Sequence, residues 1–261
     1  METIRTFEAF AGYGSQLMAL RRLEKLHPDK IKVEPVGIAE IDKYAIQAYK
    51  AVHGDVMNYG DISKIDWEKV PDFDLFTYSS PCQDFSQAGK QKGGEEGSGT
   101  RSSLLWECQK AITIKRPKYC LLENVSALVS EKFMPLFFKW FRVLEDLGYK
   151  SFWKVLNAKD YGVPQNWERV FLLSIREDVR FPYYFPKPVK LEKRLKDVLE
   201  DNVDEKYYLK DVMVDFFMRN SEEQKAKGNG FRFNPTHGDG VGKAVTTHAG
   251  GRMDDNFIKE E

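Results

Sequence analysis

The chain has 261 residues, of which 42% are hydrophobic and 13% aromatic, enough for one large α/β domain and a smaller appendage. Forty basic residues balance forty acidic ones, so the net charge does not itself indicate a nucleic-acid partner, although a neutral total can hide a basic face. The start resembles no secretory signal, no apolar run is long enough to span a membrane, and three cysteines without C-x-x-C spacing favour neither disulfides nor zinc. We therefore expect a cytoplasmic protein without a metal centre.

Strand-like and helix-like patterns alternate along the first 150 residues. The strand-like runs are rich in β-branched and aromatic residues, whereas the runs between them space their apolar residues as a helix does. Such alternation predicts βαβ units, and hence a mostly parallel, Rossmann-like α/β sheet with helices on both faces. The predicted strands are 3–10, 33–40, 74–79 and 118–125, and the predicted helices are 14–26, 42–53, 101–114 and 131–148.

Two further strand-like runs, 151–158 and 168–175, flank the sequence YGVPQN and are compatible with a hairpin that closes the sheet. The pattern then changes at the proline-rich run 182–188, which we interpret as a linker. Short helical patterns follow, and a region rich in glycine, asparagine and threonine leads to the end. The sequence thus predicts a cofactor-binding domain over 1–185 and a smaller domain over 186–261.

A glycine turn, FAGYGS at 10–15, lies where the first predicted strand meets the first predicted helix. Its glycines allow a close backbone approach to a ligand, or simply tight packing of strand on helix. Glu40 ends the second strand, where it can accept hydrogen bonds from ribose hydroxyls, and Asp61 with Ile62 follows in a place suited to an adenine amino group. Together they point to a nucleotide-like cofactor, and the absence of a full G-x-G-x-x-G or G-K-[ST] motif disfavours dinucleotides and triphosphates.

Cys82 follows Pro81 just after the strand 74–79, and a polar, glycine-rich stretch comes next. Ligands of doubly wound sheets bind outside the carboxyl ends of the strands, so this thiol is expected to open toward the cofactor. A thiol in such a loop acts as a nucleophile when nearby positive charge or donors lower its pKa. Cys108 and Cys120, inside apolar patterns, are interpreted as small buried residues.

Glu123 ends the strand 118–125, where its carboxyl group would face the same cleft or simply be solvated. Gln165 and Arg169 form another polar cluster near the strand 168–175, although an alternating polar strand would look similar. A cysteine hydrolase is disfavoured, because the four histidines lie in no recognisable context for a general base.

The chain resembles the bacterial and phage DNA (cytosine-5) methyltransferases of restriction-modification systems. The resemblance is carried, in chain order, by FAGYGS, Glu40, Asp61, SPCQDFS, GKQKG, LLENV and YGVPQN. The combination of PCQ-F-S with ENV is the specific part of this resemblance, which covers residues 5 to 176.

The resemblance implies S-adenosylmethionine as methyl donor and a cytosine flipped out of double-stranded DNA as acceptor. The Cys82 thiolate would add to C6, Glu123 would act at N3, and Arg169 would hold O2 and orient Glu123. The loop after Cys82 would close over the base. The residues implied for the cofactor pocket are Phe10, Gly12, Gly14, Ser15, Glu40, Ile41, Asp61, Ile62 and Pro81. Those implied for DNA contact are Gln83, Ser86, Lys90, Lys92, Arg101 and Gln165.

The chain departs from this family at three places. Ile41 replaces a common aromatic residue, Trp167 replaces the first arginine of Q-x-R-x-R, and the motifs of the family's C-terminal segment are absent. We therefore expect the isolated chain to be a weak catalyst, because it is truncated or because a second polypeptide supplies the remaining segment. The alternatives are a tRNA cytosine-5 methyltransferase and a catalytically impaired protein that binds S-adenosylmethionine or DNA.

Overall fold

The structure, a computed structural model, divides into two compact units. The first comprises Met1–Val155 and Arg169–Phe185, and the second Leu156–Glu168 and Pro186–Glu261. The described residues are 1–81, 101–180, 182–228, 233–245 and 255–259, with the side chains of 101–103 also outside the description.

The segment Leu156–Glu168 lies in the second unit, whereas the sequence places all of 1–185 in one domain. Backbone hydrogen bonds explain its position, since Gly242 donates to the carbonyl of Pro164 (2.9 Å) and accepts from the amide of Asn166 (2.7 Å). The roles assigned to the two domains stay predictions.

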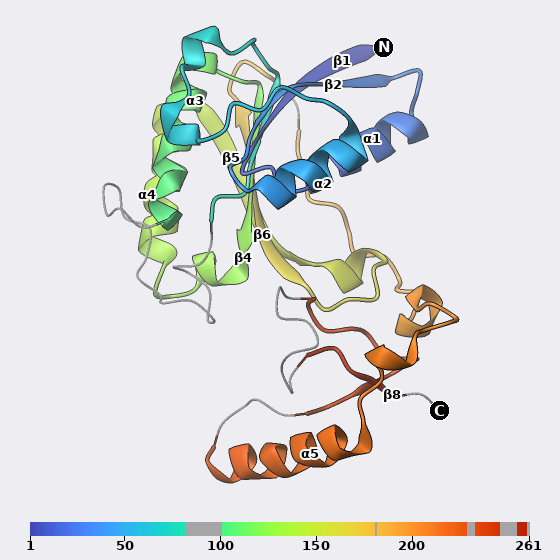
Figure 1. Ribbon diagram of the computed structural model, residues 1–261. Coiled ribbons are helices and arrows are strands. Elements are labelled where there is room, and N and C mark those ends of the chain that lie inside the picture. Colours follow the sequence, from blue (N-terminus) through green and yellow to red (C-terminus); the bar gives the residue numbers. More distant parts are fainter. Residues whose placement is uncertain (82–100, 181, 229–232, 246–254, 260–261) are drawn as a thin grey trace. The chain divides into compact units, whose positions relative to one another are not determined.

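The first unit is built on a six-stranded sheet with the order β2-β1-β3-β4-β6-β5 (Figure 1). The pairs β1–β2, β1–β3 and β3–β4 are parallel, and β4–β6 is antiparallel. This confirms the predicted α/β sheet, with the last two strands closing it. The strands are β1 (Glu2–Ala9), β2 (Ile31–Ala39), β3 (Leu75–Tyr78), β4 (Tyr119–Val125), β5 (Tyr149–Asn157) and β6 (Glu168–Arg176).

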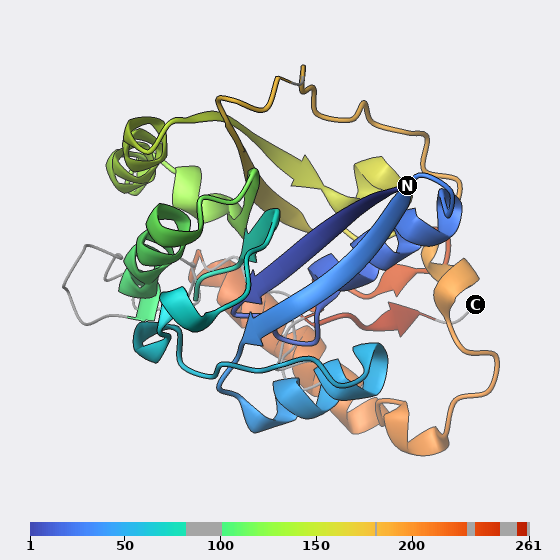
Figure 2. The ribbon, with the colours of Figure 1, turned by 90° about the horizontal axis from the view of Figure 1, so that it is seen from above.

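Helices cover both faces of this sheet, as expected (Figure 2). Helices α1 (Ser15–Leu26) and α2 (Lys43–His53) pack on one face through Leu17 and Tyr49, which join Val33 and Ile38 of β2 in one apolar cluster. Helices α3 (Glu107–Lys115) and α4 (Met134–Asp146) pack on the other face in a larger cluster. The two faces therefore have separate cores.

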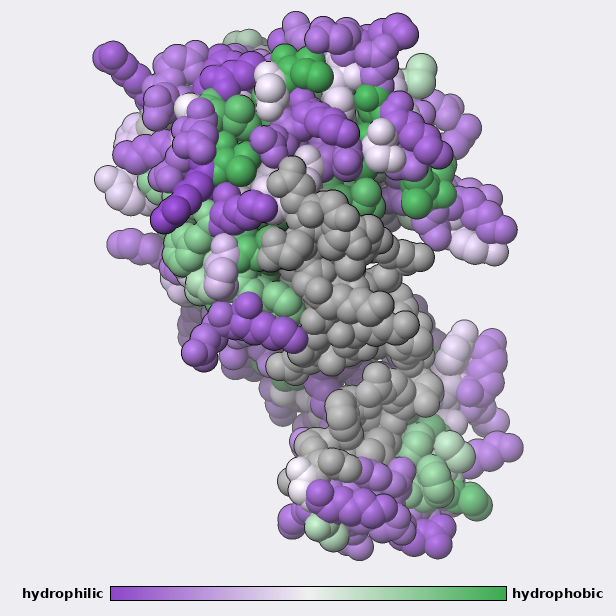
Figure 3. All heavy atoms as spheres, turned by 90° about the vertical axis from the view of Figure 1, so that its left-hand side faces the viewer, coloured by the Kyte–Doolittle hydropathy of each residue, from purple (hydrophilic) through white to green (hydrophobic). Residues whose placement is uncertain are grey.

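Aromatic rings fill the core under α3 and α4. Phe7 lies 5.1 Å from Trp67 and 6.1 Å from Phe76, measured between ring centroids, and Tyr78 of β3 contacts Trp140 of α4. The Trp140 indole donates a hydrogen bond to the Tyr78 hydroxyl (3.1 Å), which satisfies a polar group inside the core. On the outside of this face, mostly hydrophilic side chains surround small apolar patches (Figure 3).

Short 3₁₀ turns connect these elements. The predicted helix 101–114 begins as one of them. The short amphipathic run 191–199 forms only a single turn, because nine residues are too few to stabilise a helix without packing. The turns are η1 (Ile62–Lys64), η2 (Trp67–Lys69), η3 (Arg101–Trp106), η4 (Ser126–Val129), η5 (Ala158–Tyr161), η6 (Leu195–Val198) and η7 (Glu205–Tyr207).

The second unit contains α5 (Asp211–Ala226) and a small parallel pair, β7 (Thr236–His237) with β8 (Ile258–Lys259). Phe217 of α5 lies 5.4 Å from Phe233 and 5.6 Å from Phe257, and these rings form its apolar centre. Among all described residues, no helix combines the length and apolar character needed to cross a bilayer.

Candidate functional site

The order of the strands defines where a ligand is expected. Strands β2 and β3 both pair with β1, on its opposite sides, so the strand order reverses at β1. Crevices form at such a reversal, outside the carboxyl ends of the strands. The predicted cofactor residues follow these ends, since the glycine turn follows β1, Glu40 follows β2, and Pro81 comes three residues after β3.

The glycine turn between β1 and α1 has an unusual backbone. Phe10, Gly12 and Gly14 all have positive φ, at 58°, 56° and 80°. A left-handed conformation is costly for a phenylalanine, and such strain is concentrated at functional sites. A Cβ atom on Gly12 would meet no atom of the described residues within 4 Å, so the turn opens into free space on that side. Helix α1 begins next, at Ser15, with its N-terminal amides near this opening.

Backbone amides hold the Glu40 carboxylate in place. One oxygen accepts from the amide of Gly12 (2.8 Å), and the other accepts from the amides of Ile41 and Asp42 (both 2.8 Å). A carboxylate has about four acceptor sites, so capacity remains for a ligand hydroxyl. Asn58, which the sequence did not single out, donates to the Glu40 carbonyl (3.0 Å) and accepts from its amide (3.1 Å). The Ile41 side chain is 74% exposed and available to cover an apolar ring.

The other predicted cofactor residues differ in how accessible they are. Asp61 caps η1 and accepts from both the hydroxyl (2.8 Å) and the amide (3.0 Å) of Ser63, and these hydrogen bonds lower its pKa. The Ile62 side chain is only 4% exposed and packs in the core, so it supports the site from within. Ser15 is exposed and bonds its neighbour Gln16, whereas Pro81 is half-buried.

Glu123 and Arg169 form an ion pair on adjacent antiparallel strands. The Arg169 Nε lies 2.8 Å from Glu123 Oε1, because Val125 of β4 is in register with Arg169 of β6. Their side chains are 23% and 25% exposed, so a ligand can reach both. The structure thus brings together the two residues that the sequence separates by more than forty positions.

Asn124, between Glu123 and Val125, is a structural residue of the site that the sequence analysis missed. Its amide donates to the Ser80 carbonyl (3.0 Å) and to the Ser80 hydroxyl (3.3 Å), and both residues are buried. This anchors the chain directly before Pro81. The sequence did contain a signal for it. Asn124 alternates with Cys120 and Leu122 on the buried face of the strand, where a polar side chain needs a hydrogen-bond partner.

Several predicted residues cannot be placed relative to this pair. Cys82, Gln83, Ser86, Lys90 and Lys92 lie outside the described residues, as does the side chain of Arg101. Gln165 lies in the second unit, where its side chain donates to the Lys243 carbonyl (3.4 Å). Within the described parts of the chain, no group of three or more histidines, cysteines and acidic residues is arranged to hold a metal.

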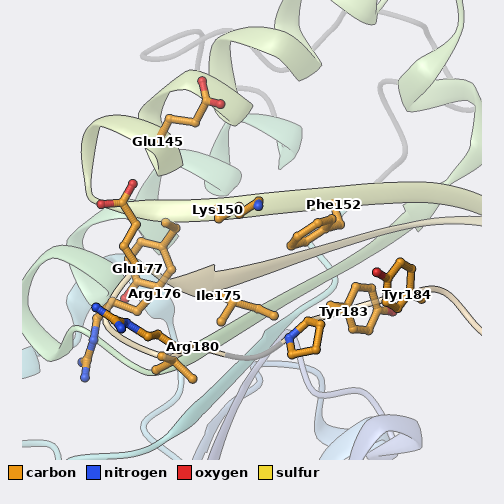
Figure 4. A pocket seen from close by; sticks show the side chains of 12 residues that line it. Glu145, Lys150, Phe152, Ile175, Arg176, Glu177, Arg180, Tyr183 and Tyr184 are labelled. Atoms are coloured by element: carbon orange, nitrogen blue, oxygen red, sulfur yellow. The ribbon is translucent and has the colours of Figure 1, made fainter.

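A cleft of about 580 Å³ lies at the far end of the same sheet (Figure 4). Phe152, Ile175, Arg176, Arg180 and Tyr183 are among the residues that line it. In the β4–β6 ladder Ile175 is opposite Tyr119, whereas Arg169 is opposite Val125 at the other end. This cleft is therefore separate from the ion pair.

Comparison with known proteins gives a consistent result. A family model for C-5 cytosine-specific DNA methylases matches residues 4–256. The type II methyltransferase M2.ScrFI of Lactococcus lactis subsp. cremoris is 40% identical over 81% of this chain and 71% of its own length. The orphan methyltransferase M.SPRI of Bacillus phage SPR is 30% identical over 96% of this chain and 65% of its own. The chain spans only 57% of a third relative, the type II methyltransferase M1.ScrFI of Lactococcus lactis subsp. cremoris.

Solved structures share the fold at low sequence identity. The methyltransferase EhMeth of Entamoeba histolytica matches with a TM-score of 0.72 at 18% identity, over 95% of this chain and 72% of that protein. The Dnmt2 methyltransferase of S. pombe matches with a TM-score of 0.68 at 20% identity, over 94% of this chain and 71% of that protein.

Proposed function

Because the chain belongs to the C-5 cytosine-specific DNA methylase family, whose methyl donor is S-adenosylmethionine, we propose that it methylates C5 of cytosine in double-stranded DNA. The ion pair of Glu123 with Arg169 is the observation that carries this proposal. Asn124, next to Glu123 on the same strand, anchors the chain two residues before Cys82. The target cytosine is flipped out of the helix, because its C5 and C6 atoms cannot be approached inside the base stack.

The chemistry assigns a separate task to each side chain. The Cys82 thiolate adds to C6 of the cytosine, and the electron pair of the C5–C6 double bond becomes available at C5. Glu123 shares a proton with N3 and so accommodates the charge of the adduct, while the Arg169 guanidinium holds the Glu123 carboxylate and reaches O2. C5 would then take the methyl group of S-adenosylmethionine, which would leave as S-adenosylhomocysteine. The C5 proton would pass to water, and expulsion of the Cys82 thiolate would restore the C5–C6 double bond.

The residues after β1 and β2 fit S-adenosylmethionine, which supplies an electrophilic methyl group when bound. The open space above Gly12 permits close approach of the ligand, and the fixed Glu40 carboxylate has acceptor capacity for ribose hydroxyls. Ile41 covers the adenine from its exposed position, and Asp61 accepts from the adenine amino group. Phe10, Gly14, Ser15, Ile62 and Pro81 complete the proposed pocket.

A second polypeptide belongs to the proposal, and a half-covered sheet face supports it. Leu122 and Leu172 are fully buried under α3 and α4, whereas Leu121 and Leu173, paired on the opposite face, are only half-buried. A doubly wound sheet normally buries both faces of its central strands. We propose that a separately encoded segment packs here and improves donor binding by the enzyme.

Methyl transfer and covalent capture test the proposed function. Purified protein and labelled S-adenosylmethionine are incubated with duplex DNA or with tRNA, alone and in competition, and 5-methylcytosine is mapped. DNA that contains 5-fluorocytosine should trap the parent chain, because fluorine does not leave as a proton does, and the Cys82→Ser variant should not be trapped. Equal trapping of both would exclude Cys82 as nucleophile, and labelling of tRNA alone would establish the alternative substrate.

Addition of the C-terminal region of M2.ScrFI as a separate fragment tests the partner. We expect tighter donor binding and faster methylation with the fragment than without it. Full activity of the chain alone, unchanged by the fragment, would contradict the need for a second polypeptide while leaving the methyltransferase assignment intact.

A further inference from the structure

Helix α2 occupies the space directly beneath the glycine turn. A Cβ atom on Gly14 would lie 2.5 Å from Nε2 of His53 and 2.6 Å from the ring of Tyr49. Real Cβ atoms do not approach other atoms so closely. Gly14 is therefore required by the two α2 side chains as well as by its φ of 80°. The glycine turn therefore packs directly against the C-terminal half of α2.

His53 fixes the carbonyl groups of the turn. Its Nε2 lies 2.9 Å from the carbonyl oxygen of Gly14 and 3.1 Å from that of Tyr13. Because both partners are acceptors, Nε2 must carry the hydrogen and donate it. The peptide carbonyl and N–H groups point in opposite directions, so this contact also turns the Ser15 N–H, in the first turn of α1, away from α2.

The other ring nitrogen shows that His53 is more than a space-filling residue. Its Nδ1 is buried and has no hydrogen-bond partner among the described residues. A buried acceptor without a donor lowers stability, and an apolar side chain would avoid that loss. Burial also lowers the pKa of His53, which favours the neutral form with a single N–H. The hydrogen bonds from Nε2 to the carbonyls of the turn offset the cost of the unpaired Nδ1.

Tyr49 acts on the start of α1 through a buried carboxylate. The Tyr49 hydroxyl donates to Glu8 Oε2 (2.8 Å), and Glu8 Oε1 accepts from the amide of Leu17 in the first turn of the helix (3.1 Å). Glu8 and Tyr49 are 2% and 1% exposed. Glu8 of β1 thus caps the N-terminus of α1, and the hydrogen bond from Tyr49 fixes the orientation of the Glu8 carboxylate.

We propose that His53 and Tyr49 are positioning residues for the methyl donor, acting through the glycine turn and the first turn of α1. They lie on the α2 side of the turn, whereas Gly12 faces open space. They set the direction of the backbone amides that a bound donor meets, without touching the donor themselves. This inference rests on the proposed location of S-adenosylmethionine at the turn.

The test compares three variants with one matched control. His53→Leu removes the N–H group that bonds the carbonyls of the turn, and His53→Gln retains an N–H close to the position of Nε2. Tyr49→Phe removes only a hydroxyl. Tyr149→Phe is the control, because Tyr149 is also 1% exposed and also donates from its hydroxyl, to the Pro117 carbonyl (2.7 Å) at the other end of the sheet. Affinity for S-adenosylmethionine is measured by calorimetry. Hydrogen exchange of the amides of residues 11–17 is measured in the free protein.

We expect His53→Leu and Tyr49→Phe to weaken donor binding about five- to tenfold, the effect of losing one buried hydrogen bond. Exchange of residues 11–17 should accelerate in both variants. His53→Gln should bind within about twofold of the parent, a difference well below that of a lost hydrogen bond. Tyr149→Phe should lower the melting temperature without changing either readout.

Two results would overturn the inference. The first is that His53→Leu and Tyr49→Phe bind S-adenosylmethionine as tightly as the parent and that the amides of residues 11–17 exchange at the parental rate. The second is an equal loss of binding in Tyr149→Phe, which would show a general effect of stability. A parent chain that binds no donor would instead refute the proposed cofactor site, and turn exchange would still show whether α2 fixes the turn.

Discussion

Asn124 holds Ser80, while its chain neighbour Glu123 holds Arg169 on the opposite face of β4. Successive side chains of a strand point to opposite faces, so two adjacent residues reach two different parts of the site. Asn124 fixes the chain just before Cys82, the proposed nucleophile, and Glu123 is the proposed partner of the cytosine N3 proton. The distance between the start of the loop and the acid is therefore set by a single rigid strand.

Replacing Asn124 by aspartate should uncouple the loop from the strand. The side chain keeps its shape but loses both donor hydrogens to Ser80, and a buried carboxylate would face a carbonyl oxygen. We expect a loss of stability of about 1–3 kcal/mol, measured by urea unfolding, and a lower kcat. The KM for S-adenosylmethionine should stay unchanged. A variant with parental kcat would show that the loop needs no anchor here.

Replacing Glu123 by glutamine should remove proton transfer while keeping the shape of the site. We expect kcat to fall by about 10²–10⁴, the usual contribution of general acid–base catalysis. Arg169→Lys keeps the charge but loses the planar guanidinium, and a smaller fall of about tenfold is expected. Single-turnover methylation of a defined duplex measures both. A larger effect from Arg169→Lys than from Glu123→Gln would contradict these roles.

Replacing Glu40 by glutamine tests the cofactor pocket. An amide cannot serve as acceptor at both ends, so one of the two groups of backbone N–H contacts is lost together with the charge. We expect donor affinity to fall about tenfold, the effect of a charged hydrogen bond, with little change in DNA affinity. Calorimetry and a DNA mobility shift measure the two. Equal losses for donor and DNA would point to general unfolding of the turn.

Replacing Trp167 by arginine should raise the turnover rate without changing donor affinity. The half-buried indole stands where the Q-x-R-x-R motif of the resembled family places its first arginine. The backbone there is fixed independently, since Asn157 accepts from the Trp167 amide (3.1 Å). An arginine thus adds a positive charge, which the resemblance implies would lie near the phosphates of bound DNA, without moving the chain. Steady-state methylation is the measurement. An unchanged or lower rate would mean that Trp167 suits its own surroundings.

The ion pairs of Asp74 with Arg5 (3.2 Å) and Lys118 (3.2 Å) should make stability depend on pH. Burial raises the pKa of Asp74, but hydrogen bonds from Arg5 and Lys118 outweigh it and lower the pKa below its usual value. The stabilisation is therefore present above the unfolded pKa of about 4 and is lost as the pH falls through the lower folded value.

Asp74→Asn should accordingly lower the free energy of unfolding by about 1–3 kcal/mol at pH 7, and the difference from the parent should shrink in acid. Asp55→Asn is the control, because the Lys50–Asp55 pair is exposed and should contribute little. Urea unfolding at several pH values gives both differences. A gap between parent and Asp74→Asn that stays constant down to pH 3 would contradict this assignment.

Much of the first unit follows from the sequence, because its signals are local. The 3.6-residue spacing of α1 and the apolar run of β3 indicate their own structure and, with the βαβ rule, their positions in the sheet. The partners of Asn124, Glu8 and His53 could not be predicted this way. Their contacts join residues far apart in the chain, and an isolated polar residue does not indicate which distant group it meets.

The assignment of Leu156–Glu168 to the second unit was missed for a related reason. Its bonds to Gly242 are backbone bonds, which leave no trace in the side-chain pattern. The Leu195–Val198 turn illustrates the opposite limit, where a convincing apolar pattern is too short to form an α-helix without further packing.

The path of the chain through the two units also determines how the protein can be dissected. The chain passes between them after Val155, after Glu168 and after Phe185, so Arg169 is the first residue after a return to the first unit. Cleavage at the proline-rich run 182–188 would therefore divide the second unit itself, since 156–168 would stay joined to the first unit while 186–261 would be held only by noncovalent contacts. A gene fragment that begins at Pro186 would lack the segment that pairs with Gly242, and should express poorly. Because we predict that the second unit reads the DNA sequence, we expect an exchange of sequence specificity between relatives to require both of its segments, 156–168 and 186–261, to be transplanted together.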